Sequence, residues 1–242
     1  MSTLTRAIVA KLFGVIGATL LLQGLTCGQS LNSKLLQEAS FVPKSTLAVD
    51  QLIEVAQHYQ IPMGIEWIEQ PGTNAPLLPQ KKPKTVRDLL AAILQQSPGY
   101  RMKAIDGVLH IYNQKFVTDQ RNFLNLRIPE FRLDRANVFD ANARLRLQIK
   151  MTLHPELYAR GWNGGYTSPP GHTLDVENIT FSGRNLTVRE ILSKISAANG
   201  NTLWVVFLDP SKRMAGERFY ASGSVSGEAT DFHWRFIPLK KD

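Results

Sequence analysis

A single cysteine, Cys27, is present among the 242 residues of the sequence. One thiol cannot form an intramolecular disulfide, and it cannot assemble a set of thiolate ligands for a metal. Stability therefore has to come from a packed core. Hydrophobic residues make up 43% of the chain, which is enough to build one.

Sequence signatures of catalysis are also missing. The chain has no G-x-S-x-G nucleophile motif, no HExxH zinc motif and no cluster of cysteine and histidine. We expect His58 at the exposed end of a helix and His110 in a hairpin strand, both as surface or partly packed residues. The remaining histidines and the candidate serine nucleophiles have no partner motif beside them; they are His154, His172, His233, Ser168, Ser182 and Ser193. These absences predict a protein that is not an enzyme and that binds no metal or cofactor.

Acidic residues are absent from the chain before Glu38. Arg6 and Lys11 precede an apolar run over Leu12–Leu22, which is too short for a membrane-spanning helix and is typical of a secretory signal. We therefore expect residues 1–28 to be a signal segment that exports the protein. A mitochondrial presequence is the alternative, because that class also carries arginine and few acids.

Cys27 follows shortly after the apolar run, where bacterial lipoproteins carry a lipidated cysteine. The match is partial, because Gly24 and Thr26 stand where that signal usually has Leu and then Gly or Ala. We expect either a lipid anchor on Cys27 or simple cleavage nearby, after Gly28 or Ser30. If residues 1–28 are a bacterial secretory or lipoprotein signal, we expect the protein in the periplasm or at the outer membrane.

Positive charge is in excess, with 28 Lys and Arg against 20 Asp and Glu, a net charge of +8. Such a balance can indicate nucleic acid or an anionic membrane as partner. The basic residues are scattered, however, and the longest local cluster is only Lys81-Lys82-Pro83-Lys84. We therefore predict no nucleic-acid partner, and membrane contact only through a lipid anchor on Cys27.

One helix-forming stretch occurs twice in the chain. Thr85-Val86-Arg87-Asp88-Leu89-Leu90 matches Thr187-Val188-Arg189-Glu190-Ile191-Leu192. In each copy a threonine precedes an acid by three positions, which predicts a capping box at the start of a helix. Apolar residues follow at helical spacing, and we expect the helices to end before Gly99 and Gly200.

The segments around the first copy indicate further elements. A helical pattern covers residues 46–60, and an extended run covers residues 61–68. A hairpin with Asp106-Gly107 at its turn follows the copied helix. The first unit therefore reads as helix, strand, helix and hairpin.

The second copy has a comparable setting. A helical pattern over residues 137–151 and a strand over residues 173–181 precede it. An apolar strand over residues 202–208 follows it, and the return strand lies in either residues 218–221 or residues 231–239.

The sequence thus predicts an α+β fold of two tandem small modules, each with two helices packed on a short β-sheet. Between them, Asn122–Pro129 alternates enough to form a strand, and Pro129 restricts that strand to an edge or an end. The expected division is a signal segment (1–28), a weakly ordered tether (29–44), a first module (45–115), a linker or edge strand (116–136) and a second, more divergent module (137–242).

Four pieces of the first unit form a known pattern: Leu52-Ile53-Glu54-Val55-Ala56, Ile61-Pro62-Met63-Gly64-Ile65, the capped helix from Thr85 to Leu90, and Val108-Leu109-His110-Ile111. Together they resemble the short N-terminal domain shared by secretins and TonB-dependent receptors. The second unit matches mainly over Val176–Val206. The resemblance implies a periplasmic protein-interaction or signalling module that is not an enzyme, here as a tandem pair without a barrel or a secretin pore.

The most unusual string is Gly161-Trp162-Asn163-Gly164-Gly165-Tyr166, with Pro169-Pro170 after it. It lacks the Lys-Ser/Thr continuation of a phosphate-binding loop, so we expect a rigid surface loop. Trp162 and Tyr166 are candidate contacts for a partner. The alternative function is a carbohydrate- or small-ligand-binding protein, or an enzyme, that uses the Gly161–Gly171 loop.

Taken together, these patterns predict an exported, non-enzymatic protein of the bacterial cell envelope that binds another envelope protein. Small sheets of the expected kind offer exposed strand edges, so pairing with an incoming strand is the expected mode of binding. A structural module whose partner is a second copy of itself is a further alternative.

Overall fold

The computed structural model describes residues 31–68, 83–120, 122–153, 155, 179–200, 202–208 and 234–239. After a short helical segment at residues 31–36, the elements in chain order are α2 (Ala48–Tyr59), β1 (Met63–Ile68), α3 (Val86–Gln95), β2 (Tyr100–Ile105), β3 (Val108–Asn113), the 3-10 turn η1 (Phe123–Asn125), β4 (Arg127–Ala136), α4 (Val138–Leu153), β5 (Ile179–Thr187), α6 (Val188–Asn199), β6 (Thr202–Leu208) and β7 (Trp234–Pro238). The fold is α+β, which confirms the expected class.

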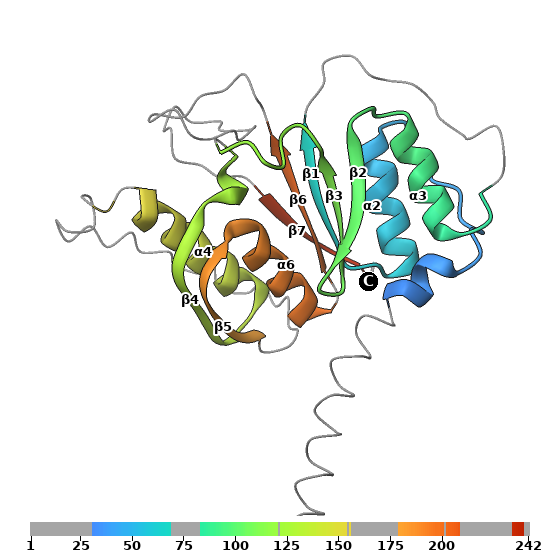
Figure 1. Ribbon diagram of the computed structural model, residues 1–242. Coiled ribbons are helices and arrows are strands. Elements are labelled where there is room, and N and C mark those ends of the chain that lie inside the picture. Colours follow the sequence, from blue (N-terminus) through green and yellow to red (C-terminus); the bar gives the residue numbers. More distant parts are fainter. Residues whose placement is uncertain are drawn as a thin grey trace, which may run out of the picture.

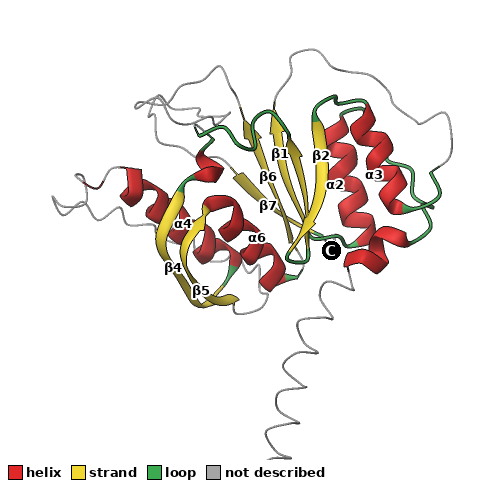
Figure 2. Ribbon diagram, in the orientation of Figure 1, coloured by secondary structure: helices red, strands yellow, loops and turns green. Residues whose placement is uncertain are grey.

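A mixed five-stranded sheet lies at the centre, in the order β2-β3-β1-β6-β7 (Figure 1). β1 runs parallel to both β3 and β6, whereas β2 and β7 are antiparallel to their neighbours. Helices α2 and α3 lie on one side of this sheet, and α4, α6 and the β4–β5 ribbon lie on the other (Figure 2). The result is a sheet with both faces covered.

Strands from the two units expected from the sequence share this sheet. β1 belongs to the first unit and β6 to the second, and they pair in parallel from Gly64 opposite Trp204 to Ile68 opposite Leu208. This arrangement corrects the expectation that each module packs on a sheet of its own. The physical reason lies in β6, which is apolar on both faces and buried at nearly every position, and such strands belong in the interior of a sheet.

The repeated helices form as predicted. The Thr85 hydroxyl accepts from the Asp88 N–H and the Asp88 carboxylate accepts from the Thr85 N–H, and Thr187 and Glu190 form the same capping box. Gly200 ends α6 in the left-handed conformation, with φ of 70°. Both stretches therefore carry their own start signal, and folding of the helix ends is local.

The hairpin of the first unit is also confirmed. β2 and β3 pair antiparallel from Tyr100 opposite Asn113 to Ile105 opposite Val108. The two turn residues, Asp106 and Gly107, have positive φ of 50° and 79°. Two such residues make the tight turn whose twist matches the strands that it joins.

The second unit departs from the first in its pairing. Strand β5 pairs with β4 in a separate two-stranded sheet and not with the β6–β7 hairpin. β4 covers the stretch expected as a linker or edge strand, and Pro129 lies in this outer ribbon as expected. Of the two expected positions for the return strand after β6, β7 confirms the later one. Residues 173–178, where a strand was expected, lie outside the described residues.

The segment expected as a tether is packed where the structure describes it, so that expectation is wrong for residues 31–44. Leu31, Leu35 and Ala39 are buried in the core between the sheet and helices α2 and α3. The Tyr59 hydroxyl accepts hydrogen bonds from the backbone N–H groups of Ser40 and Phe41, at 2.9 and 3.0 Å. Leucines four positions apart lie on one helix face, and they close the end of the core.

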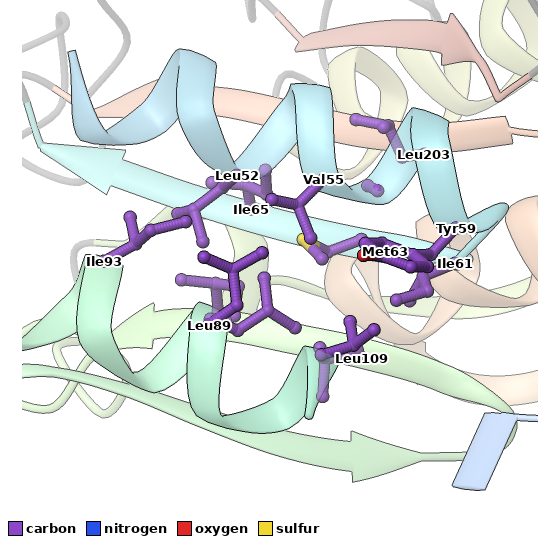
Figure 3. Packing of buried hydrophobic residues seen from close by; sticks show 14 of the residues in the cluster. Leu52, Val55, Tyr59, Ile61, Met63, Ile65, Leu89, Ile93, Leu109 and Leu203 are labelled. Carbon is purple, nitrogen blue, oxygen red and sulfur yellow. The ribbon is translucent and has the colours of Figure 1, made fainter. Parts of the chain in front are cut away.

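Two hydrophobic clusters fill the two sides of the sheet. The first joins α2, α3 and β1, and Figure 3 shows its labelled side chains meeting between the two helices and the sheet. Leu203 and Val205 of β6 belong to this cluster, whereas Trp204 and Val206 belong to the other. β6 thus contributes to both cores, and each fully buried aliphatic side chain is worth about 1.5–3 kcal/mol.

The contact between β1 and β6 depends on Gly64. Trp204 is fully buried, and its ring lies so close over Gly64 that a Cβ atom there would be 2.3 Å from the ring carbon Cζ2. A glycine inside a strand commonly marks such a close approach. Gly64 and Trp204 therefore fit each other across the two halves of the chain.

We expect Gly64→Ala to lower the free energy of unfolding by about 1–3 kcal/mol, because the added methyl group has to displace the buried indole. In a Trp204→Leu background the same substitution should cost clearly less, because the smaller side chain leaves room. Urea unfolding of the four proteins measures both costs. Equal costs in the two backgrounds would show that β1 and β6 do not meet at these residues.

Candidate functional site

The site residues predicted from the sequence lie outside the described residues. This holds for Cys27, for Trp162 and Tyr166, and for the whole Gly161–Gly171 loop. Lipidation of Cys27 and partner contact through the aromatic pair therefore stay predictions. Among the described residues, two other features qualify as candidates: a buried polar cluster beneath α6 and the exposed edge of β2.

The polar cluster is built around an ion pair between helix and sheet. Glu66 on β1 is only 2% exposed. The Arg189 Nη2 group donates to Glu66 Oε2 at 2.9 Å, and Nε donates to Oε1. Arg189 Nη1 donates to the side-chain oxygen of Asn125 on η1. One guanidinium thus joins α6, β1 and η1, and its planar fork matches the carboxylate.

His110 and Ser193 extend this cluster toward β3. His110 is 3% exposed, so the expectation of a surface or partly packed residue is wrong, although its place in a hairpin strand is confirmed. Helix α6 covers this part of the sheet and brings Ser193 Oγ to 3.0 Å from His110 Nε2. The Trp204 ring meets the imidazole edge to face, with 5.9 Å between ring centroids. By contrast, His58 is exposed near the end of α2, as predicted.

The Ser193–His110 pair is not arranged for nucleophilic catalysis. Ser193 Oγ donates its proton to the Arg189 carbonyl oxygen at 2.9 Å, which leaves Nε2–H of His110 as the donor to Oγ. A catalytic histidine has to accept the hydroxyl proton, and a third group usually orients it. Here His110 Nδ1 has no hydrogen-bond partner among the described residues. The geometry therefore indicates a packed polar core and not a serine nucleophile.

The protonation of His110 follows from its surroundings. Burial lowers the pKa of His110 to about 4, and the nearby positive charge of Arg189 contributes in the same direction. The ring is therefore neutral at neutral pH. Because Glu66 already balances the Arg189 guanidinium, a neutral ring avoids an uncompensated charge in this cluster.

The second candidate is the outer edge of β2. In the described part of the chain, β2 pairs with β3 on one side and with no strand on the other. Most of its residues are exposed, and only Tyr100 is buried. Such an edge presents backbone N–H and C=O groups that another strand can pair with.

Two of the other strand edges in the described part, those of β7 and β4, are interrupted. β7 ends in Pro238, which lacks an N–H and whose carbonyl oxygen accepts from Gln57 Nε2 at 3.0 Å. β4 contains Pro129, and its pairing with β5 has an irregularity between Leu133 and Ala136. Proline and bulges are the usual means by which proteins block strand pairing. β2 contains neither.

A shallow groove lies between β4 and α4, with a volume of about 600 Å³. Its lining includes Arg132 and Arg144 but also Glu130. Charges of both signs give it no clear preference for an anion or a cation, so we do not assign it a ligand.

No protein-family model, no curated protein and no solved structure matches this chain. Within the described ranges, no helix is long and apolar enough to cross a membrane. The same residues contain no group of three or more His, Cys, Asp and Glu side chains that could hold a metal ion. The chain's own geometry is therefore the ground for a functional proposal.

Stability should depend on pH through His110. Its ordinary pKa is about 6.5, so between pH 6.5 and about 4 the unfolded chain binds a proton that the folded chain does not. The free energy of unfolding should therefore fall as the pH decreases through this window, by up to about 1.4 kcal/mol per pH unit, and this contribution should be constant above it.

Urea unfolding at a series of pH values measures that slope. His110→Gln should flatten it, whereas His58→Gln, the same change at an exposed position, should leave it as in the wild type. An unchanged slope in His110→Gln would show that His110 is not the source of this pH dependence.

Loss of the buried guanidinium should be costly. We expect Arg189→Met to lower the free energy of unfolding by about 3–5 kcal/mol, because the Glu66 carboxylate is then buried without a partner. Adding Glu66→Gln should recover part of this loss. Arg87→Met, at the equivalent but exposed position of the first copy, should change stability by less than about 0.5 kcal/mol. Simply additive costs of the changes at 66 and 189 would contradict the ion pair.

Proposed function

We propose that the protein is an exported, non-enzymatic interaction module of the bacterial cell envelope, and that it binds a partner by adding a strand to the β2 edge. The observation that carries this proposal is the exposed, uninterrupted edge of β2. The signal-like first 28 residues and the resemblance to the N-terminal domain of secretins and TonB-dependent receptors support the location.

Backbone geometry identifies the groups that would bind. The Leu109 N–H donates to the Pro62 carbonyl oxygen at 2.9 Å, so the backbone groups of Leu109 face away from β2. Ala104 lies directly opposite Leu109 in a pair without mutual hydrogen bonds, so the N–H and C=O groups of Ala104 also point away from β3. Because backbone groups alternate in direction along a strand, the N–H and C=O groups of Met102 also point outward, whereas those of Lys103 point to β3. A partner strand would thus pair with the N–H and C=O groups of Met102 and Ala104.

The side chains around this edge suit an added strand. Met102 packs against the core between the sheet and helices α2 and α3, so an incoming residue beside it would extend an apolar surface. Ala104 is exposed and small and leaves room for a neighbouring side chain. Main-chain hydrogen bonds would supply affinity, and side chains on alternate positions would supply selectivity.

Ala104→Pro removes an outward N–H without removing a bond to β3. We expect this variant to capture roughly tenfold less partner from a bacterial envelope fraction than Ala104→Val, which keeps the N–H. Quantitative mass spectrometry of the captured proteins measures the ratio. Equal capture by the two variants would refute pairing at β2.

Two comparisons control this experiment. Ala104→Pro should unfold within about 1 kcal/mol of Ala104→Val, whereas Lys103→Pro should be less stable because it loses a bond to β3. Trp162→Ala combined with Tyr166→Ala tests the alternative function. Capture that depends on these aromatic residues and not on Ala104 would favour the Gly161–Gly171 loop as the binding site.

A further inference from the structure

One face of β2 carries an unbalanced positive charge. Arg101 and Lys103 lie two positions apart, so their side chains project from the same face of the strand, and both are exposed. Met102 projects from the opposite face and packs on the core. Neither Arg101 nor Lys103 forms an ion pair with any residue that the structure describes; the Arg101 Nη1 group donates only to the carbonyl oxygen of Tyr100.

No acidic side chain on the hairpin strands balances these charges. On the face of Arg101 and Lys103, the residues of β2 and β3 are otherwise Ile105, Val108, His110 and Tyr112. Ile105 is 39% exposed, so the face stays open toward the outer edge. The acid of the hairpin, Asp106, lies in the turn. A strand added at β2 would therefore meet two cations and no anion on this face.

We infer that the strand bound at β2 is acidic, with Asp or Glu at two alternate positions and apolar or small residues between them. This inference rests on the proposed function. Side chains directly opposite each other on neighbouring strands interact, and opposite charges stabilise the pair. The acidic positions would face Arg101 and Lys103, and the intervening residues would lie beside Met102 and Ala104, next to α3.

The same charges argue against a second copy as the occupant. If two copies paired antiparallel about Met102, Arg101 of each would lie opposite Lys103 of the other. Pairing about Lys103 would place two lysines opposite each other. Like charges directly opposite are destabilising, and charged edge residues are a common defence against self-pairing. The charges thus select for a partner of the opposite sign.

Short capped peptides with an alternating pattern test the inference on the full-length protein. One carries Glu and Val in alternation, a second has Gln in place of Glu, and a third has Lys. We expect the Glu peptide to shift the amide NMR signals of Met102 and Ala104. The Gln peptide should bind roughly three- to tenfold more weakly, and added salt should reduce this difference.

Charge reversal gives the matched control. Arg101→Glu combined with Lys103→Glu should turn the preference toward the Lys peptide. Arg132→Glu combined with Arg144→Glu makes the same change of net charge in the groove between β4 and α4, and it should leave the preference for the Glu peptide in place. A loss of preference only in this second variant would overturn the inference.

The remaining outcomes separate the inference from the proposed function. Equal binding of the Glu and Gln peptides at Met102 and Ala104 would overturn the acidic partner while leaving strand pairing intact. No shift with any peptide would also overturn it, and the Ala104→Pro capture experiment would then judge strand pairing separately.

Self-association provides a last readout by analytical ultracentrifugation. We expect Arg101→Thr combined with Lys103→Thr to self-associate more than the wild type, because the like-charge repulsion is gone. A wild-type dimer that Ala104→Pro dissociates would instead show that a second copy occupies the edge, and it would overturn the acidic partner.

Discussion

Parallel pairing of β1 with β6 is the constraint on which the rest of the structure depends. It brings strands from the two halves of the chain into one sheet, with the Trp204 indole lying over Gly64. Because β6 is apolar on both faces, it closes the core beneath α2 and α3 and the core beneath α6 at once. Neither half of the chain can complete its own core without the other, so the two units form one cooperative structure.

The duplicated helix shows how one sequence pattern can serve two purposes. Thr85 and Thr187 cap their helices in the same way. The arginines at equivalent positions differ, since Arg87 is exposed whereas Arg189 pairs with buried Glu66. Local signals fix where a helix starts, but the surface that it meets decides which of its polar residues becomes part of the core. The ion pair then fixes the orientation of α6 on the sheet, because a buried charge tolerates few alternative positions.

Local elements could be predicted from the sequence because their signals are short-range. The capping boxes and the Asp106-Gly107 turn fall into this class, whereas the sequence left two positions open for the return strand after β6. Pairing of β1 with β6 could not be predicted by the same means, because no local pattern states which distant strand is the neighbour. The apolar run of β6 did signal an interior strand, whereas His110 is buried because α6 packs over β3, a contact that no local pattern states. For the candidate site, the exposed edge was expected in general terms, but its location at β2 required the sheet order; Cys27, Trp162 and Tyr166 lie outside the described residues.

The sheet order also has a consequence for biogenesis. Because a polypeptide is synthesised from its N-terminus, β1 is made long before β6, yet β1 needs β6 to cover one of its two edges. Until β6 is made, one edge of β1 is unpaired and the Trp204 indole is not yet in place over Gly64. Contacts between residues so distant in sequence form slowly, and exposed edges invite association in the meantime. The architecture that unites the two halves thus leaves one edge of β1 open to association with other chains until β6 pairs with it.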